Sequence, residues 1–188
     1  MKIAGIKKPF QALSFQTLNE HTDKKNISEL IIPLLDGKDI ALLSEAGCPA
    51  IADPGSEIVR LAHQKNIPVK PVAGTSSIFM ALMASGMNGQ QFVFHGYLPK
   101  EQGERIKKIK ECEQQALKKK YTQIFIEAPH RNNHLLEDIL NECQQDTLLC
   151  IASAITGENE FIKTKNISAW KKTVPELHKI PTVFLIGK

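Results

Sequence analysis

Apolar and polar residues alternate along the chain with two periods, and this predicts strands that alternate with helices. Over 24–35, apolar residues such as Ile27, Leu30 and Ile31 recur at helical spacing on one face. Short apolar runs bounded by Gly, Pro or polar residues are typical of buried strands. The predicted helices are 24–35, 54–65, 76–85, 101–118, 131–143 and 167–173. The predicted strands are 40–43, 69–72, 92–94, 122–127, 148–153, 160–163 and 181–186.

Strands that alternate with helices throughout indicate an α/β protein with mostly parallel pairing. The pattern is interrupted at 95–99 (H-G-Y-L-P), where Gly and Pro follow a predicted strand. We therefore expect a domain boundary there, with an N-terminal α/β domain over 1–95 and a C-terminal α/β domain over 96–188. No convincing strand precedes Ile40, and we expect the first domain to be incomplete.

Two loops of small residues follow the predicted strands 40–43 and 69–72. The first runs to Asp53-Pro54, which we expect to cap the next helix, and the second is 73–77 (A-G-T-S-S). Ligands of open α/β sheets bind outside the carboxyl ends of strands, so the loops predict a cleft lined mostly by backbone. A tight turn and an ordinary helix cap are the alternatives for the two loops. Neither loop has the Gly-rich pattern of an NAD(P) or ATP site.

Charge and cysteine content refine this picture. The net charge is +4, and segment 100–120 carries eight basic and four acidic residues, a difference of 8 − 4 = +4. This basic segment can attract an anionic partner such as RNA, although a solvated helix face is the simpler interpretation. The four cysteines form no C-x-x-C pair, which favours reduced thiols and a cytoplasmic location. The longest apolar run, 78–84, is too short to span a membrane.

Candidate chemistry gathers at the end of the predicted strand 122–127. Glu127, His130 and Arg131 could hold a polar substrate there, or form a helix cap with a surface ion pair. His130 and His134 have a spacing that can chelate zinc, but no third ligand is evident, and we expect no metal. Cys48 could act as a nucleophile, but a small residue lining the loop is the simpler interpretation.

Four segments resemble motifs of the tetrapyrrole (corrin/porphyrin) methylases, the class III methyltransferases that use S-adenosylmethionine (SAM). Segment 44–55 (S-E-A-G-C-P-A-I-A-D-P-G) resembles the S-[DE]-A-G-x-P-x-[IV]-[SA]-D-P-G signature of the group named ribosomal RNA small subunit methyltransferase I. Segments 71–86, 94–99 and 126–131 resemble P-x-P-G-P-x-A-x-x-x-A-L-x-x-S-G, F-x-G-F-L-P and F-Y-E-S-P-H-R. The resemblance covers the chain from about residue 25 to its end.

The resemblance implies a two-domain fold, with a mostly parallel sheet in the first domain and a mixed sheet in the second. It implies a homodimer that binds folded SAM between the domains. By motif position the cofactor would contact small or apolar residues of both domains. These are Ala46, Gly47, Cys48, Ile51, Ser77, Ile78, Ala152 and Thr182.

The function that the resemblance implies is methylation of a ribose 2′-hydroxyl in small-subunit ribosomal RNA, with the 30S subunit as partner. Glu127, His130 or His95 could accept the hydroxyl proton, and Arg131 with His130 would contact the substrate. Methylation of a tetrapyrrole carbon is the alternative. A non-catalytic, truncated member that only dimerises or binds RNA is another.

This chain departs from the family's pattern in three ways. Cys48 replaces Thr, and Gly74-Thr75 replaces Gly-Pro. The family also opens with a strand and a P-T-P-I-G-N-L-x-D loop that this chain lacks, so we expect about fifty further residues, two or three elements, in front.

Overall fold

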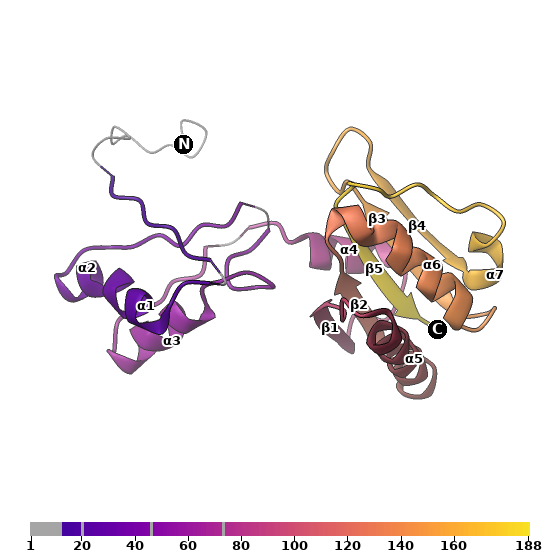
Figure 1. Ribbon diagram of the computed structural model, residues 1–188, viewed down its shortest axis with the longest axis horizontal. Helices are drawn as coiled ribbons and strands as arrows, with labels where there is room; N and C mark the ends of the chain where they lie inside the picture. The colour runs from indigo at the N-terminus through magenta and orange to yellow at the C-terminus, as the bar shows by residue number, and fades with distance from the viewer. Residues whose placement is uncertain (1–12, 20, 46, 73) are drawn as a thin grey trace. The chain divides into compact units, whose positions relative to one another are not determined.

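The computed structural model of the 188-residue chain describes residues 13–19, 21–45, 47–72 and 74–188 (Figure 1). The chain divides into two compact units, residues 1–74 and 75–188. The domain boundary expected between 95 and 96 stays a prediction, and residues 75–95 lie in the second unit here.

The described part of the first unit contains three short helices, α1 (Lys24–Leu30), α2 (Ile32–Leu35) and α3 (Ser56–Gln64). The single helix predicted over 24–35 is wrong, because the helix is interrupted at Ile31. Pro33 is the physical reason: it has no N–H to donate, and its ring would collide with the carbonyl four residues earlier in a continuous helix.

The strands predicted at 40–43 and 69–72 are not formed, and these two predictions were wrong. Leu43 is 75% exposed and Val72 is 92% exposed, so neither run is buried. A strand needs a neighbouring strand to bond its backbone groups, and the described part of this unit contains no strand with which either segment could pair. The parallel sheet expected in the first domain is therefore not present among these residues. The cap expected from Asp53 is also absent, because α3 is preceded by Gly55 and has no side-chain cap.

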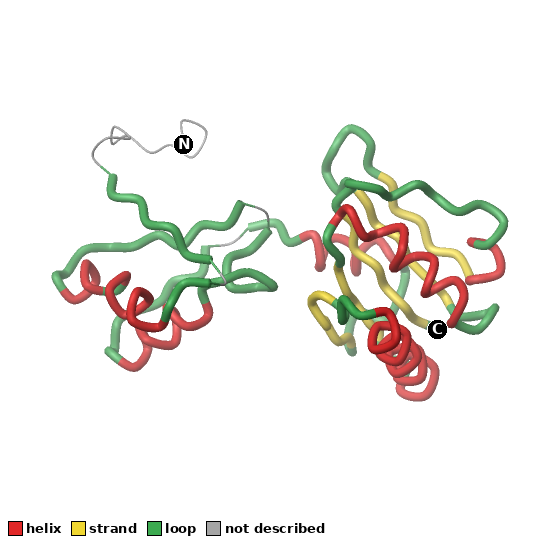
Figure 2. Tube along the Cα trace, in the orientation of Figure 1, coloured by secondary structure: helices red, strands yellow, loops and turns green. Residues whose placement is uncertain are grey.

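The second unit is an α/β layer structure (Figure 2). Its helices are α4 (Ser77–Ser85), α5 (Gln102–Lys119), α6 (Asn132–Glu142) and α7 (Ile167–Trp170), with a 3₁₀ turn at Pro129–Arg131. Its strands are β1 (Phe92–Tyr97), β2 (Thr122–Ile126), β3 (Leu148–Ser153), β4 (Phe161–Asn166) and β5 (Thr182–Gly187). Every element predicted from 76 onward is present, with bounds that differ by a few residues.

The five strands form one sheet in the order β1-β2-β5-β3-β4. β1 and β2 run parallel, whereas the β2–β5, β5–β3 and β3–β4 pairs are antiparallel. The α/β class and the mixed sheet expected for the second domain are confirmed. β4 lies at one edge of the sheet, as predicted for 160–163.

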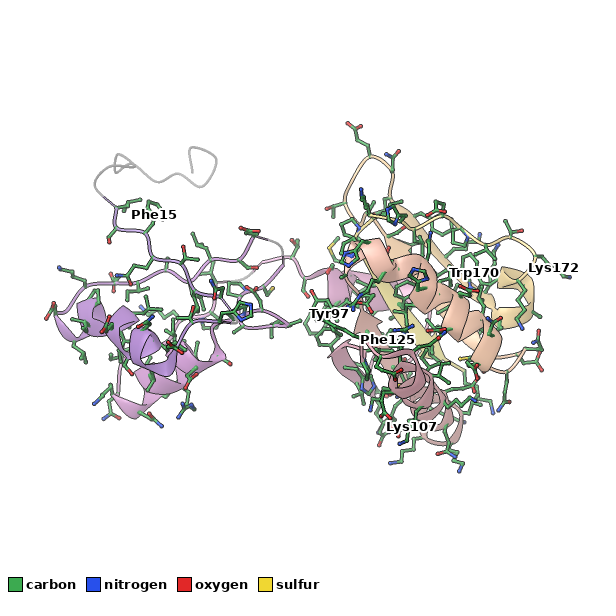
Figure 3. The ribbon with its side chains drawn as sticks, in the orientation of Figure 1. Phe15, Tyr97, Lys107, Phe125, Trp170 and Lys172 are labelled. Atoms are coloured by element: carbon green, nitrogen blue, oxygen red, sulfur yellow. The ribbon has the colours of Figure 1, made fainter. Side chains whose placement is uncertain are left out.

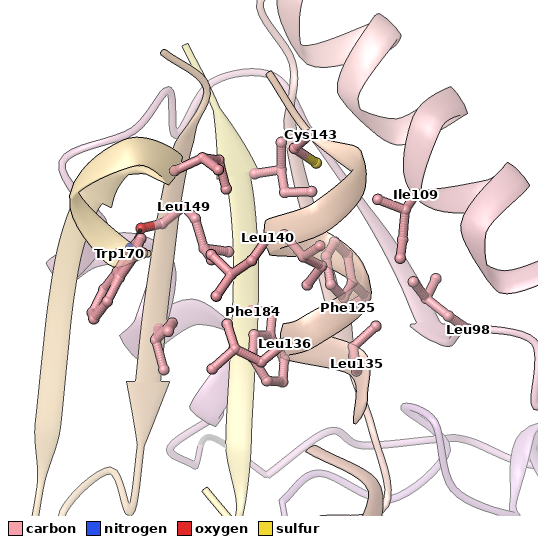
Figure 4. Packing of buried hydrophobic residues seen from close by; sticks show 14 of the residues in the cluster. Leu98, Ile109, Phe125, Leu135, Leu136, Leu140, Cys143, Leu149, Trp170 and Phe184 are labelled. Atoms are coloured by element: carbon pink, nitrogen blue, oxygen red, sulfur yellow. Dashed lines mark hydrogen bonds between the residues drawn. The ribbon is translucent and has the colours of Figure 1, made fainter. Parts of the chain in front are cut away.

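Both faces of this sheet are apolar. Successive side chains of each central strand point to opposite sides, and the residues on both sides are mostly apolar. Phe125, Ile151 and Phe184 pack against α5, α6 and α7 in one cluster (Figure 4). Their neighbours along the strands belong to a second cluster with α4, which includes Ala81, Leu82, Ile124, Cys150, Ala152, Val183 and Leu185. Because the central strands are buried on both faces, their sequences are nearly continuous apolar runs.

A buried ion pair joins α5 to α6. Arg105 Nε lies 2.6 Å from Asp138 Oδ2, and both side chains are less than 10% exposed. Gln102 donates to Asp138 Oδ1 at 3.0 Å, and Arg105 Nη1 donates to the carbonyl of Lys100 at 2.8 Å. The charges are thus paired and hydrogen-bonded, which is the condition under which buried charges are tolerated.

Candidate cofactor and substrate site

The loop 47–55 has an unusual backbone. Gly47, Ala50, Ala52 and Gly55 have φ angles of 78°, 64°, 53° and 138°. Positive φ is uncommon for alanine and costs roughly 1–3 kcal/mol, and such residues cluster at ligand sites. Because the side chains are small, this backbone stays open to a ligand. The cleft lined by backbone that the sequence predicts at this loop stays a prediction.

Gly55 is favoured by its backbone conformation. Its φ angle of 138° lies in a region that residues with a side chain rarely adopt. A Cβ atom at this position would also lie 2.5 Å from Leu42 Cδ2, so the end of the Leu42 side chain would have to shift. The glycine of the D-P-G motif thus has a conformational role that does not depend on a ligand.

The predicted cofactor residues of the first unit lie at the start of this loop. Gly47 and Ile51 are exposed, Cys48 is partly buried, and Ala46 lies outside the described residues. A cavity of about 380 Å³ lies at the other end of the loop. It is lined by Leu18, Asn19, Thr22, Ile27, Asp53, Pro54, Gly55, Ser56, Glu57 and Ile58. The cavity therefore does not include the predicted residues, and their cofactor role stays a prediction.

The predicted cofactor residues of the second unit lie in two places. Ser77 and Ile78 begin α4, whose N-cap Ser76 makes no side-chain bond to the helix. Ala152 and Thr182 lie on neighbouring strands, and both are buried. The Thr182 hydroxyl donates to the carbonyl of Ile180 at 2.9 Å. A ligand could reach these two strand residues only if the groups that cover them moved, so this role also stays a prediction.

Glu127 and Arg131 form a compact ion pair at the end of β2. Glu127 is buried, and its Oε1 accepts hydrogen bonds from Arg131 Nη2 and from the backbone N–H of Ala128 at 2.6 Å. The 3₁₀ turn brings Arg131 back over Glu127 before α6 begins. His130, between them, is exposed and makes no hydrogen bond to another described residue. The structure thus pairs Glu127 with Arg131 and leaves the His130 side chain exposed.

Two buried side-chain atoms, one in this ion pair and one in the next residue, have no hydrogen-bond partner within the described structure. They are Arg131 Nε, a donor, and Asn132 Oδ1, an acceptor. Leaving such groups unsatisfied costs about 1–3 kcal/mol each, so a bound water or ligand group is expected there. Sequence reasoning missed Asn132; its signal was a polar residue at the first position of an amphipathic helix.

His95 lies apart from this pair, on β1. Its Nε2 lies 2.8 Å from Gln123 Oε1 and 3.5 Å from Cys112 Sγ. Burial lowers the pKa of His95, with the hydrogen bond to Gln123 opposing this effect. Burial also raises the pKa of Cys112 to about 11. The imidazole is therefore neutral at pH 7 and faces protein groups.

The described residues offer neither a metal-binding cluster nor a membrane-spanning helix. They contain no group of three His, Cys, Asp or Glu side chains that could hold a metal ion. They also contain no helix with the length and hydropathy needed to cross a bilayer.

Comparison with known proteins identifies the family. The family model described as Tetrapyrrole (Corrin/Porphyrin) Methylases matches residues 6–169. The chain belongs to this family. This membership confirms the resemblance read from the four motifs.

Curated relatives agree with this assignment. "Ribosomal RNA small subunit methyltransferase I" of Thermotoga maritima is 38% identical over 97% of this chain and 78% of its own. The proteins of the same name from Pasteurella multocida and Haemophilus influenzae are 34% and 32% identical over 92% and 97% of this chain. The chain spans only 58% and 62% of the lengths of these last two relatives.

Solved structures confirm the fold of this methylase chain. The methyltransferase CobJ superposes with a TM-score of 0.65 at 17% identity, covering 99% of this chain and 79% of CobJ. Diphthine synthase gives a TM-score of 0.59 at 18% identity, covering 88% of this chain and 67% of that one. At these identities the similarity concerns architecture alone.

Proposed function

We propose that the chain is a SAM-dependent methyltransferase of small-subunit ribosomal RNA that acts on a ribose 2′-hydroxyl. The observation that carries the proposal is the 32–38% identity to relatives named for that RNA over most of this chain. The tetrapyrrole alternative has less support, because the similarity to CobJ and to a uroporphyrin-III-C-methyltransferase amounts to 17–18% identity. We also propose that the protein works in the cytoplasm as a homodimer.

The residues present are compatible with such a cofactor. The backbone of loop 47–55, with its positive φ angles and small side chains, offers amide and carbonyl groups that could hold it. A sulfonium cofactor supplies an already activated methyl group when bound. The protein then has mainly to align the acceptor oxygen and exclude water.

The acceptor hydroxyl must lose its proton, and we propose that His130 is the group that accepts it. Glu127 is less suited, because its carboxylate already accepts from Arg131 and Ala128. His95 is less suited because its Nε2 faces Gln123 and Cys112 beneath α5. His130 is exposed, and Arg131 beside it can meet a phosphate. In this arrangement Glu127 is a positioning residue that holds the Arg131 side chain.

The exposed lysines of α5 would attract the RNA backbone. Two of them are partly neutralised, because Lys108 lies 3.5 Å from Glu111 and Lys110 lies 2.8 Å from Glu142. Lys107, Lys118 and Lys119 are exposed without such a pair. The helix therefore keeps a net positive face for long-range attraction.

The first test is calorimetric titration of the chain with S-adenosylhomocysteine, followed by methyl transfer to 30S subunits. Micromolar or tighter binding and 2′-O-methylated RNA are expected. Binding that returns only when the relatives' N-terminal segment is added would place the activity in a longer polypeptide. No binding in either form would contradict the proposal.

His130→Ala tests the assignment of the proton acceptor. We expect a loss of about 10²–10⁴-fold in kcat with an unchanged affinity for S-adenosylhomocysteine. His134→Ala is the matched control, because His134 is exposed one turn further on. An equal loss in both variants, or none in His130→Ala, would remove His130 from the mechanism.

A further inference from the structure

A second hollow lies at the edge of the sheet, away from the residues discussed above. It has a volume of about 260 Å³ and is lined by Phe161, Lys163, Lys165, Trp170, Thr173 and Pro175. We call it the β4–α7 groove. Enclosed ligand pockets usually measure about 300–1,000 Å³, so this groove suits a small part of a longer ligand.

The two-residue period of β4 builds the wall of the groove. Phe161, Lys163 and Lys165 alternate with residues that point to the other face of the sheet, so all three lie on one side. Lysines two residues apart on a strand are separated by about 7 Å. Each ammonium group can therefore meet a different anionic group of one extended ligand.

Trp170 forms a rigid floor. It is 1% exposed, and its Nε1 donates to the carbonyl of Leu149 at 2.8 Å (Figure 4). The ring centroid lies 4.6 Å from Lys165 Nζ and 6.2 Å from the ring centroid of Phe161. The cation–π contact holds Lys165 in place, while Phe161, 39% exposed, presents ring surface to solvent.

Between Glu160 and Glu176, which flank the lining residues in sequence, the charged side chains are of one sign. Residues 161–173 contain four lysines, Lys163, Lys165, Lys171 and Lys172, and no acidic residue. None of the four forms an ion pair with a described carboxylate, unlike Lys108 and Lys110 of α5. Lys172 extends outward beyond Trp170 (Figure 3). The groove thus combines an exposed aromatic ring with unneutralised positive charge.

We propose that the β4–α7 groove binds single-stranded RNA, with one base on Phe161 and the neighbouring phosphates on Lys163 and Lys165. An aromatic ring beside a basic track is the usual surface for single strands, because every base has a face that can stack. The inference rests on the proposed RNA substrate and adds a contact surface to it. The groove would hold RNA that flanks the methylated nucleotide.

The test uses the full chain and a fluorescein-labelled oligouridylate of about twelve nucleotides, followed by anisotropy at several salt concentrations. Phe161→Ala should weaken binding about tenfold through lost stacking, and Phe161→Leu, which keeps the apolar bulk, should weaken it similarly. Lys163→Gln with Lys165→Gln should lower the slope of log K against log salt by about 1.4, or about 0.7 for each phosphate contact.

Two matched controls separate the groove from general effects. Lys38→Gln with Lys65→Gln removes two exposed lysines of the first unit, and Val174→Ala trims an exposed side chain beside the groove. Both should leave affinity and salt slope unchanged, apart from a small loss of non-specific attraction. If the Lys38 and Lys65 variant lowers the slope as much as the groove variant, the inference is overturned.

Titration of each variant with S-adenosylhomocysteine distinguishes the two proposals. Normal binding of this cofactor product with weakened RNA binding in the groove variants supports the inference. Wild-type RNA affinity and slope in those variants would overturn the inference and leave the proposed function standing. If poly-glutamate competes as well as oligouridylate, and Phe161→Ala has no effect, the groove is a site for acidic protein and the inference fails.

Discussion

The two units of the chain differ most in how they bury apolar side chains. Among the described residues of the first unit, the buried hydrophobic side chains are Ile27, Ile31 and Ala62. In the second unit both faces of a five-stranded sheet are covered, and large side chains such as Phe184 and Trp170 are almost fully buried. The sequence has the same alternating pattern in both regions, so the pattern alone does not produce a core.

The reason lies in where each element finds its hydrogen-bond partners. A helix bonds its own backbone, and helices formed in both units in each range that the period indicated, although 24–35 is interrupted at Ile31. A strand bonds only to another strand, which is distant in sequence. Segments 40–43 and 69–72 have the composition of strands but no neighbour among the described residues, so they remain exposed.

The largest contrast is expected from core truncation. Phe184→Ala should lower the free energy of unfolding by about 3–5 kcal/mol, because it empties a site that is stacked against Phe125. Ile31→Ala, its counterpart in the first unit, should leave this main transition unchanged in urea denaturation followed by circular dichroism. Equal shifts of one transition would show that the two units unfold together.

Ion pairs provide the next contrast. Asp138→Ala should cost about 3 kcal/mol, because it leaves the Arg105 charge buried without a partner. Glu57→Ala removes the exposed partner of Arg60 in the first unit and should cost less than about 0.5 kcal/mol. The same denaturation experiment measures both, and a small effect at Asp138 would mean that water reaches Arg105.

The reactivity of the cysteine thiols should also differ between the two units. Burial raises the pKa of Cys112 to about 11 and raises the pKa values of Cys143 and Cys150. A buried thiol that resists ionisation reacts slowly, so iodoacetamide at pH 8 should label the partly buried Cys48 first, as mass spectrometry would record.

The raised pKa of Cys112 also links stability to pH. Its contribution is fully present below the ordinary value of 9.0 and is lost as pH rises towards 11, because the unfolded thiol ionises first. Cys112→Ser should flatten the fall in stability over that range. Early labelling of Cys112 in the native protein would contradict both expectations.

The smallest effect is expected at the unformed strand. Val72→Thr should change stability by less than about 0.5 kcal/mol, because Val72 is exposed. Val183→Thr makes the same change in buried β5 and should cost about 1–3 kcal/mol by placing a hydroxyl among apolar groups. A comparable loss at Val72 would show that 69–72 is a buried strand in solution.

The candidate site was only partly predictable. Motif residues identified the loop 44–55 and the group Glu127, His130 and Arg131, of which the structure pairs Glu127 with Arg131. An ion pair was one of the alternatives for that group, but it did not follow from sequence that Glu127 is buried, or that His95 faces Cys112 and Gln123. Those contacts join residues whose side-chain directions depend on neighbouring elements. The β4–α7 groove was missed for the same reason, since Phe161 and Trp170 meet only when β4 and α7 pack.

By itself the sequence determined the α/β class, the family and nearly every element after residue 75, because local periodicity and short motifs encode them. Tertiary structure alone decided which strands form, which charges are paired and which aromatic rings stay exposed. The physical reason is that helix periods and turn residues act over a few positions. Strand pairing, burial and desolvation depend instead on groups that are brought together from distant parts of the chain.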